Sequence, residues 1–255
     1  MSTGSVDEPA EPAATRKPLA DRLVHEAVDL VRTGGPGAMS LREVQRRAGV
    51  SPAAAYRHFR DRDALLLAVA QECAGMLADH IAAALEDAPP FTGEPGSARA
   101  RLLAVCAAYL DFATGNPGLY RAIFTSDEQI DELTAPSQRA RGSAGDGGYN
   151  LLVSTLQDLV NATGGTHLNP WDPLALWATC HGLAMLRLDA ALRLLPEEAF
   201  THARDRILAT ITTAVPLESL THPAGAVAPA SQDRPQNQPQ TPRKKEAATP
   251  ARPQQ

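Results

Sequence analysis

Apolar residues along this chain recur at spacings of three and four, and no segment shows sustained alternation with a period of two. Spacings of three and four place apolar side chains on one face of an α-helix, whereas a half-buried strand would need alternation. We therefore expect an all-α fold. The pattern predicts helices over residues 18–34, 40–48, 52–59, 62–85, 97–114, 117–126, 150–161, 172–195 and 196–215.

Two short helices follow the first one. Ser40 and Glu43 have the spacing of a capping box, in which the hydroxyl and the carboxylate each satisfy a backbone N–H, and Gly49 ends this helix in the left-handed conformation. Ser51 is expected to cap the next helix, with Pro52 at its first position, where no N–H is needed. Two short helices joined by a Gly-containing turn form a helix-turn-helix, a motif that binds DNA.

Asp61 is expected to cap the long helix that leads out of this motif. The two ends of the chain are rich in Pro, Ala and polar residues without apolar spacing, which predicts disorder, and the Gly- and Ser-rich stretch at 131–148 predicts a mobile loop. The expected organisation is a disordered leader at 1–17, a helix-turn-helix domain at 18–62, a larger helical domain at 63–221 and a disordered Pro- and Gln-rich tail at 222–255.

Charge is distributed unevenly along the chain. Residues 16–62 carry ten Lys or Arg and five Asp or Glu, a net charge of +5, whereas the whole chain carries −5. The basic segment is suited to phosphate, and the acidic remainder would be repelled by it. The alternative is that these charges only solvate helix faces.

With 255 residues, 44% of them hydrophobic, the chain can form two packed domains. No apolar run approaches the roughly 18 residues that span a bilayer, and residues 1–18 lack the apolar stretch of a signal peptide. We expect a cytoplasmic protein with no membrane partner.

Cys73, Cys106 and Cys180 lie in apolar helical patterns, which predicts small core residues and no metal site, although a redox-sensing pair stays open. No cofactor is expected.

Ala48-Gly49-Val50-Ser51, followed by Tyr56-Arg57-His58-Phe59, resembles the signature of the TetR family of bacterial regulators. The resemblance covers roughly residues 19–85. A second stretch, residues 112–121 together with Trp177 and His181-Gly182, resembles the C-terminal domain type of that family named for Trp, His and Gly. The resemblance implies a homodimeric transcriptional regulator, commonly a repressor, that binds a palindromic operator and is released by a small-molecule effector. Residues 63–221 would then bind the effector and form the dimer.

The second helix of the motif, predicted over residues 52–59, is the one expected to enter the major groove. Pro52, Ala53 and Ala54 offer no side-chain hydrogen bonds, so they can recognise only apolar features such as thymine methyl groups. Arg42 lies where the family can reach a base, and its planar fork suits O6 and N7 of guanine; the alternative is a solvated surface charge. The remaining expected DNA contacts, mainly to phosphate, are Ser40, Ser51, Tyr56, Arg57, His58 and Arg62.

His58 has a structural alternative as a hydrogen-bonded histidine, and Phe59 is expected in the core.

A single small motif reads too little DNA, so two copies related by a twofold axis are expected. Apolar stripes on the last two helices are the predicted dimer interface, unless both stripes face only their own core. The residues of these stripes are Ala184, Leu188, Ala191 and Leu195 on the first helix and Ile207, Ile211 and Val215 on the second.

By resemblance, the larger domain holds a pocket for an effector. The candidate lining is aromatic and mostly apolar, as small-molecule sites tend to be. It consists of Tyr109, Phe112, Tyr120, Phe124, Trp177, His181 and Met185, each of which could instead be a core residue.

Enzyme motifs are incomplete in this sequence. His25-Glu26 is followed by Asp29 where a zinc-protease helix needs His, and Arg141 stands where a nucleophile elbow needs Gly. We therefore expect no enzymatic activity. An architectural or effector-independent DNA-binding protein is the remaining alternative, because the reading helix carries few hydrogen-bonding side chains.

Overall fold

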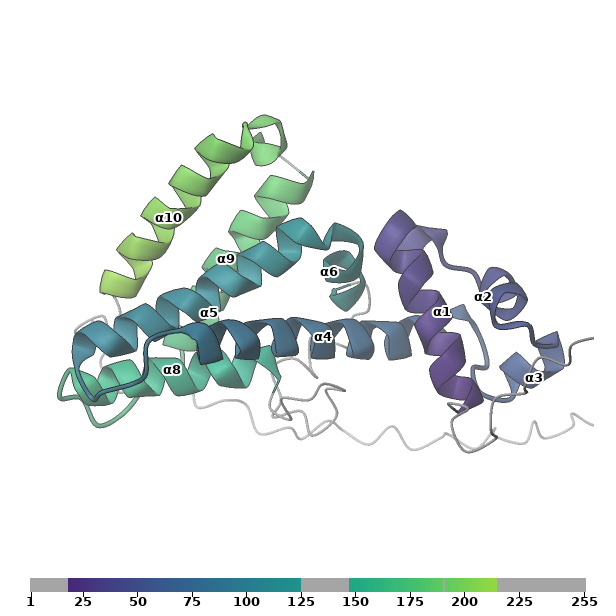
Figure 1. Cartoon of the computed structure of the whole chain (residues 1–255), viewed down its shortest axis with the longest axis horizontal. Coiled ribbons are helices and arrows are strands. Elements are labelled where there is room, and N and C mark those ends of the chain that lie inside the picture. Colours follow the sequence, from purple (N-terminus) through teal and green to yellow (C-terminus); the bar gives the residue numbers. More distant parts are fainter. Residues whose placement is uncertain (1–17, 125–146, 190, 215–255) are drawn as a thin grey trace, which may run out of the picture. The chain divides into compact units, whose positions relative to one another are not determined.

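The computed structural model describes residues 18–124, 147–189 and 191–214. Within these residues the chain is all-α, as predicted, with no strand (Figure 1). The α-helices are α1 (Leu19–Gly34), α2 (Leu41–Ala48), α3 (Pro52–Tyr56), α4 (Arg62–Asp87), α5 (Pro95–Gly115), α6 (Pro117–Ile123), α8 (Gly148–Ala162), α9 (Asp172–Asp189) and α10 (Glu197–Ala214), and the short 3-10 helices are η2 (Pro36–Ala38) and η3 (Ala191–Leu194). The predicted leader, most of the predicted loop and the predicted tail lie outside the described residues.

The helix-turn-helix is formed by α2 and α3. Oγ of Ser40 accepts a hydrogen bond from the backbone N–H of Glu43 at 3.2 Å, and Gly49 ends α2 with φ 65°, in the left-handed region. The reciprocal half of the predicted capping box is wrong, because the Glu43 carboxylate instead accepts hydrogen bonds from Arg46 and Arg47. An exposed carboxylate gains more from two guanidinium groups than from one backbone amide.

The second motif helix is shorter than predicted. Oγ of Ser51 accepts from the N–H of Ala54 at 3.3 Å, as expected of the cap. The helix ends at Tyr56 and not at Phe59, since the N–H of His58 bonds back to the carbonyl of Ala55 at 2.9 Å and tightens the last turn. Asp61 then caps α4 by accepting from the N–H of Ala64 at 2.8 Å.

The long helix α4 contacts α1, α5, α6 and α8, and its buried side is a stripe at intervals of four residues. By length and apolar composition α4 would also pass for a membrane-spanning helix, but half of its most apolar stretch is buried inside the protein, which is typical of a core helix. The stripe consists of Leu65, Val69, Cys73, Leu77 and Ile81.

The larger domain is built around α5, which contacts α4, α6, α8, α9 and α10. Cys73, Cys106 and Cys180 are buried free thiols, which confirms their prediction as core residues. Burial raises the pKa of Cys73 to about 12, which keeps this thiol protonated and unreactive.

The helix predicted over residues 172–195 is interrupted. α9 ends at Asp189, η3 follows, and α10 begins at Glu197. Arg187 holds this corner: Nη1 donates to the carbonyls of Leu192 (3.0 Å) and Leu195 (2.8 Å), and the guanidinium lies 4.7 Å from the centre of the Phe200 ring. Carbonyls at a helix end need such donors once the helical ladder stops.

Candidate functional site

The predicted DNA-contacting residues lie on the exposed side of the helix-turn-helix. The opposite side, including Val44, Ala55 and Phe59, is buried, so Phe59 is the core residue that the sequence predicts. Tyr56 is 55% exposed, so its ring and hydroxyl are accessible to a partner. Ser40, Arg42, Ser51, Pro52, Ala53, Tyr56, Arg57 and His58 are exposed, and Ala54 and Arg62 are half-buried.

The arginines of the motif differ in how they are paired. Arg46 and Arg47 share the Glu43 carboxylate, and their hydrogen bonds lower the pKa of Glu43 to about 2, with that of Arg46 contributing most. No described residue pairs with the guanidinium of Arg42 or Arg57. These two cations are therefore available to an anionic partner.

Two further arginines hold α2 in position. Nε of Arg62 donates to the carbonyl of Met39 (3.1 Å) and Nη2 to that of Pro36 (2.8 Å), immediately before α2. At the other end, Nη2 of Arg22 donates to the carbonyl of Ala48 at 2.7 Å. The Arg62 guanidinium is thus already bound to two backbone carbonyls, and this positioning role competes with the predicted contact to a phosphate. The spacing of residues in the sequence does not identify Arg22 as this donor, although the orphan carbonyls at the end of α2 imply one.

Five of the predicted effector-pocket residues form one aromatic cluster between α5, α6 and α9. The ring of His181 stacks on that of Trp177 with centres 5.2 Å apart. Two further pairs pack edge to face, His181 with Phe124 at 4.5 Å and Tyr109 with Tyr120 at 5.7 Å between ring centres. Met185, one turn beyond His181 on α9, is half-buried against the same core. Phe112 lies apart from the cluster, because it is buried and faces His80 at 5.8 Å.

Hydrogen bonds join three members of this cluster. Nδ1 of His181 lies 2.8 Å from the hydroxyl of Tyr120 and 3.1 Å from that of Tyr109, and the two hydroxyls are 2.9 Å apart. Burial lowers the pKa of His181 and raises the pKa of both tyrosines, so all three groups are neutral near pH 7. A neutral ring that accepts at Nδ1 carries its proton on Nε2, which is then a donor.

The lowered pKa of His181 predicts that the free energy of unfolding decreases as the pH is lowered. In the unfolded chain His181 takes up a proton near its ordinary pKa of 6.5, whereas the folded protein resists protonation. As pH drops below about 6.5 the unfolded state gains the proton first, so the free energy of unfolding decreases. His181→Asn, whose oxygen can replace Nδ1 as acceptor, should lack this contribution. Urea denaturation at pH 5 to 8 measures the free energy of unfolding of the original protein and of His181→Asn. The same pH dependence in both proteins would contradict this prediction.

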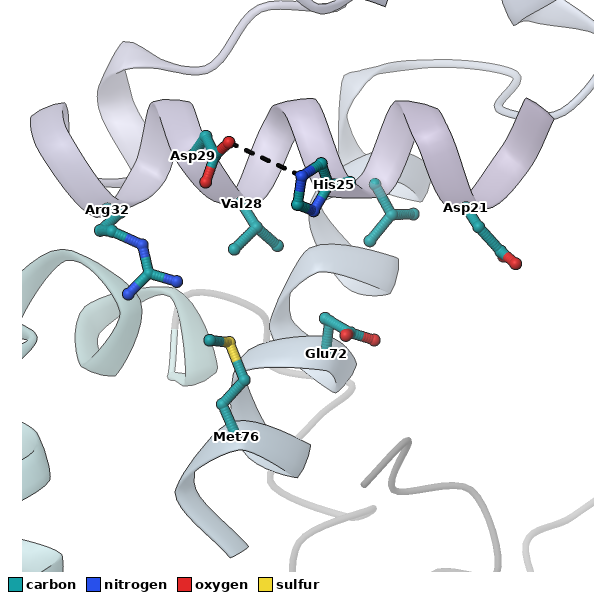
Figure 2. Close-up of a pocket in the computed structure, with 8 residues that line it drawn as sticks. Asp21, His25, Val28, Asp29, Arg32, Glu72 and Met76 are labelled. Carbon is teal, nitrogen blue, oxygen red and sulfur yellow. Dashed lines mark ion pairs between the residues drawn. The ribbon is translucent and has the colours of Figure 1, made fainter. Parts of the chain in front are cut away.

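The structure also shows a groove of about 440 Å³ between α1 and α4 (Figure 2). None of the predicted effector-pocket residues lines it.

The exposed apolar face of α9 is not the predicted one. Ala184 is fully buried in the same core as Leu183, Leu188 is half-buried, and Ala191 lies beyond the end of α9. Spacing defines the faces of a helix but not which face turns inward, and α9 packs on α5 and α8 through the face that contains Ala184. Leu195 is exposed, Ile207 and Ile211 are half-buried, and Val215 lies outside the described residues. The side chains exposed at intervals of four are Leu174, Ala178 and Leu186, with Gly182 between them.

Helix α6 joins the aromatic cluster to the DNA-binding domain. It carries Tyr120 of the cluster, and its Gly118 packs so closely on the end of α1 that a Cβ there would lie 2.2 Å from the carbonyl oxygen of Val31. It also contacts η2, whose Pro36 carbonyl is held by Arg62. A displacement of α6 would therefore press directly on the segment before α2.

Two family models match this chain. The model described as "Bacterial regulatory proteins, tetR family" matches residues 23–69, which contain the helix-turn-helix. The model described as "Tetracyclin repressor-like, C-terminal domain" matches residues 102–211, which contain the aromatic cluster. The chain belongs to the TetR family. It is a transcriptional regulator with a DNA-binding helix-turn-helix domain and a helical C-terminal domain.

Solved structures agree with this fold. A protein of unknown function from Rhodococcus sp. RHA1 is 28% identical with a TM-score of 0.56, covering 78% of this chain and 98% of that one. The transcriptional regulator FadR from Bacillus subtilis, in complex with stearoyl-CoA, is 12% identical with a TM-score of 0.51 and covers 76% and 98%. At that identity the second likeness concerns the fold alone. No curated protein matches the chain.

Proposed function

We propose that this TetR-family regulator is a cytoplasmic repressor that binds a palindromic operator as a homodimer and is released by a small-molecule effector. The observation that carries the DNA-binding part is the exposed side of the helix-turn-helix, which presents Arg42 on α2 and Tyr56 and Arg57 at the end of α3. Regulators of this family are generally not enzymes, and we propose that this one acts by binding alone.

Recognition divides between apolar and polar contacts. Pro52, Ala53 and Ala54 meet thymine methyl groups, and Arg42 supplies the hydrogen-bonded base contact. Tyr56 contacts a phosphate or a base, and the phosphate contacts are made by Arg57, His58 and the N-terminal ends of the two motif helices at Ser40 and Ser51. Arg62 contributes chiefly by fixing the segment before α2.

Arg42→Ala is expected to weaken operator binding by about 1–3 kcal/mol and to relax selectivity at one base position, because it removes a bidentate base contact. Arg57→Ala is the matched control, since a lost phosphate contact weakens binding to all sequences alike and reduces the salt dependence. Binding-site selection with each variant measures both effects. An unchanged base preference for Arg42→Ala would remove Arg42 from base recognition.

The dimer interface that we propose is the exposed face of α9 formed by Leu174, Ala178, Gly182 and Leu186, which replaces the buried Ala184 face. A Cβ on Gly182 would meet no atom within 4 Å in the protomer, so the glycine is not needed for the fold of one chain. A small residue between two leucines lets a second helix approach closely, as in packed helix pairs.

Gly182→Leu is therefore expected to shift the dimer toward monomer at micromolar concentration while leaving the protomer folded. Sedimentation equilibrium measures the mass, and circular dichroism confirms the helical content. Gly96→Leu, at an equally open position in the first turn of α5, should leave the mass unchanged. A variant at position 182 that dimerises like the original protein would refute this interface.

For the effector we propose the aromatic cluster, with Met185 at its edge. A bound molecule would displace Tyr120 and hence α6, and α6 would act on α1 and η2 through Gly118. Coupling of about 1–3 kcal/mol is enough for such a response. The two α2-holding arginines, Arg22 and Arg62, would carry the displacement into the helix-turn-helix.

The test of the function as a whole is selection of bound duplexes from a random library at near-physiological salt. A palindromic site supports the dimeric, sequence-specific regulator. The second candidate, an architectural protein, is favoured by the three small apolar residues at the start of α3; enrichment of only generic or bent DNA would support it instead.

A further inference from the structure

The groove between α1 and α4 lies apart from both proposed binding sites, and its floor is apolar. Val24 and Val28 of α1 are almost fully buried, and Met76 of α4 is half-buried beside them. The volume of about 440 Å³ falls within the range of small-molecule sites.

Charges of opposite sign stand at the two ends of this groove. Figure 2 shows Arg32 at one end of the α1 face and Asp21 at the other, with Glu72 of α4 on the Asp21 side. Between them, Nε2 of His25 lies 3.9 Å from the Asp29 carboxylate, so these two side chains face each other. The helical rise places Arg32 roughly 16 Å from Asp21 along α1. The groove therefore has an acidic end at Asp21 and Glu72 and a basic end at Arg32. Between them lies the apolar floor, with the His25–Asp29 pair along its α1 side.

We propose that this groove binds an elongated amphoteric molecule, with an ammonium group at Asp21 and Glu72, an aliphatic chain over Val24, Val28 and Met76, and a carboxylate at Arg32. Burial of the methylene groups on the apolar floor would supply most of the affinity. The charged ends would orient the ligand, because exposed ion pairs contribute little energy but discriminate against the reversed arrangement.

The probe is 8-aminooctanoate, compared with octylamine and octanoate, each of which carries only one of the charges. Protein labelled at the methionine methyl groups lets NMR follow Met76 directly, and the buried Met39 methyl is an internal reference. A dissociation constant of roughly 1 mM is expected for so small a ligand. No DNA is present, so the result does not depend on the function proposed above.

Two substitutions test which charged group of the ligand binds at each end of the groove. Glu72→Gln should weaken 8-aminooctanoate and octylamine about fivefold and leave octanoate unchanged, whereas Arg32→Gln should weaken 8-aminooctanoate and octanoate by a similar factor and leave octylamine unchanged. Glu86→Gln, on the exposed part of α4 outside the groove, is the matched control for lost negative charge.

The proposal is overturned if the Met76 methyl of the original protein does not respond to 8-aminooctanoate. It is also overturned if octylamine or octanoate alone binds as tightly, or if Glu72→Gln and Glu86→Gln behave alike. The wild-type titration with the three ligands decides the matter even where a variant folds poorly.

Discussion

Gly118→Ala is expected to lower the free energy of unfolding by about 3 kcal/mol, at the upper end of the cost of overpacking. The added Cβ would lie 2.2 Å from the carbonyl oxygen of Val31 and 3.1 Å from that of Arg32. Both neighbours are backbone atoms at the end of α1, which cannot rotate away as a side chain can. Relief requires α6 to move away from α1 as a unit. Urea denaturation of the full chain measures the change.

The chain offers a matched control in Gly96→Ala. Gly96 follows Pro95 at the start of α5 as Gly118 follows Pro117 at the start of α6, but a Cβ at position 96 meets no atom within 4 Å. Alanine should be neutral there or stabilise by up to about 1 kcal/mol, since it favours the helix. Equal stability of the two variants would mean that α6 does not press on α1 as closely as the structure shows.

The same contact links stability to function. Because α6 also carries Tyr120, a variant that separates α6 from α1 should interrupt any signal from the aromatic cluster to the helix-turn-helix. Val31 and Gly118 are far apart in the sequence, and nothing in the spacing of apolar residues predicts their contact. Only the packing of α6 against α1 and η2 reveals it.

Local chemistry explains what could be predicted from the sequence. The caps at Ser40, Ser51 and Asp61 and the left-handed Gly49 each depend on a few neighbouring residues, and all four are confirmed. Where a residue has competing partners, the sequence was insufficient: Glu43 turns to Arg46 and Arg47 because both are one turn away on the same helix.

Most of the features that could not be predicted from the sequence depend on packing between residues far apart in the chain. The aromatic residues of α5, α6 and α9 were grouped by composition, and five of the seven do meet, but Phe112 turns toward His80 on α4. On α9, apolar and small residues occur on more than one face, so a stripe containing Ala184 and one containing Gly182 look equally plausible in the sequence. Contact with α5 decides between them.

Arg187→Ala is the second large effect, with an expected loss of about 3 kcal/mol in the free energy of unfolding. The guanidinium binds the carbonyls of Leu192 and Leu195, pairs with Glu197 and lies over the Phe200 ring, while its side chain is only 15% exposed. Hydrogen bonds that involve a charged group contribute roughly 1.5–3 kcal/mol each, and part is regained when the freed carbonyls meet water. Denaturation at fixed protein concentration is required, since dimerisation would add to the apparent stability.

Two further variants distinguish the role of Arg187 at this corner from the general effect of removing an arginine. Arg193→Ala, on the exposed surface of η3, should change stability by less than about 0.5 kcal/mol. Arg187→Lys should recover only part of the loss, because a point charge cannot hold two carbonyls and a carboxylate while lying flat on a ring. Hydrogen exchange should localise the loss to η3 and the start of α10. If exchange there is unchanged in Arg187→Ala, the corner between α9 and α10 is held by its buried apolar contacts at Phe200 and not by the guanidinium.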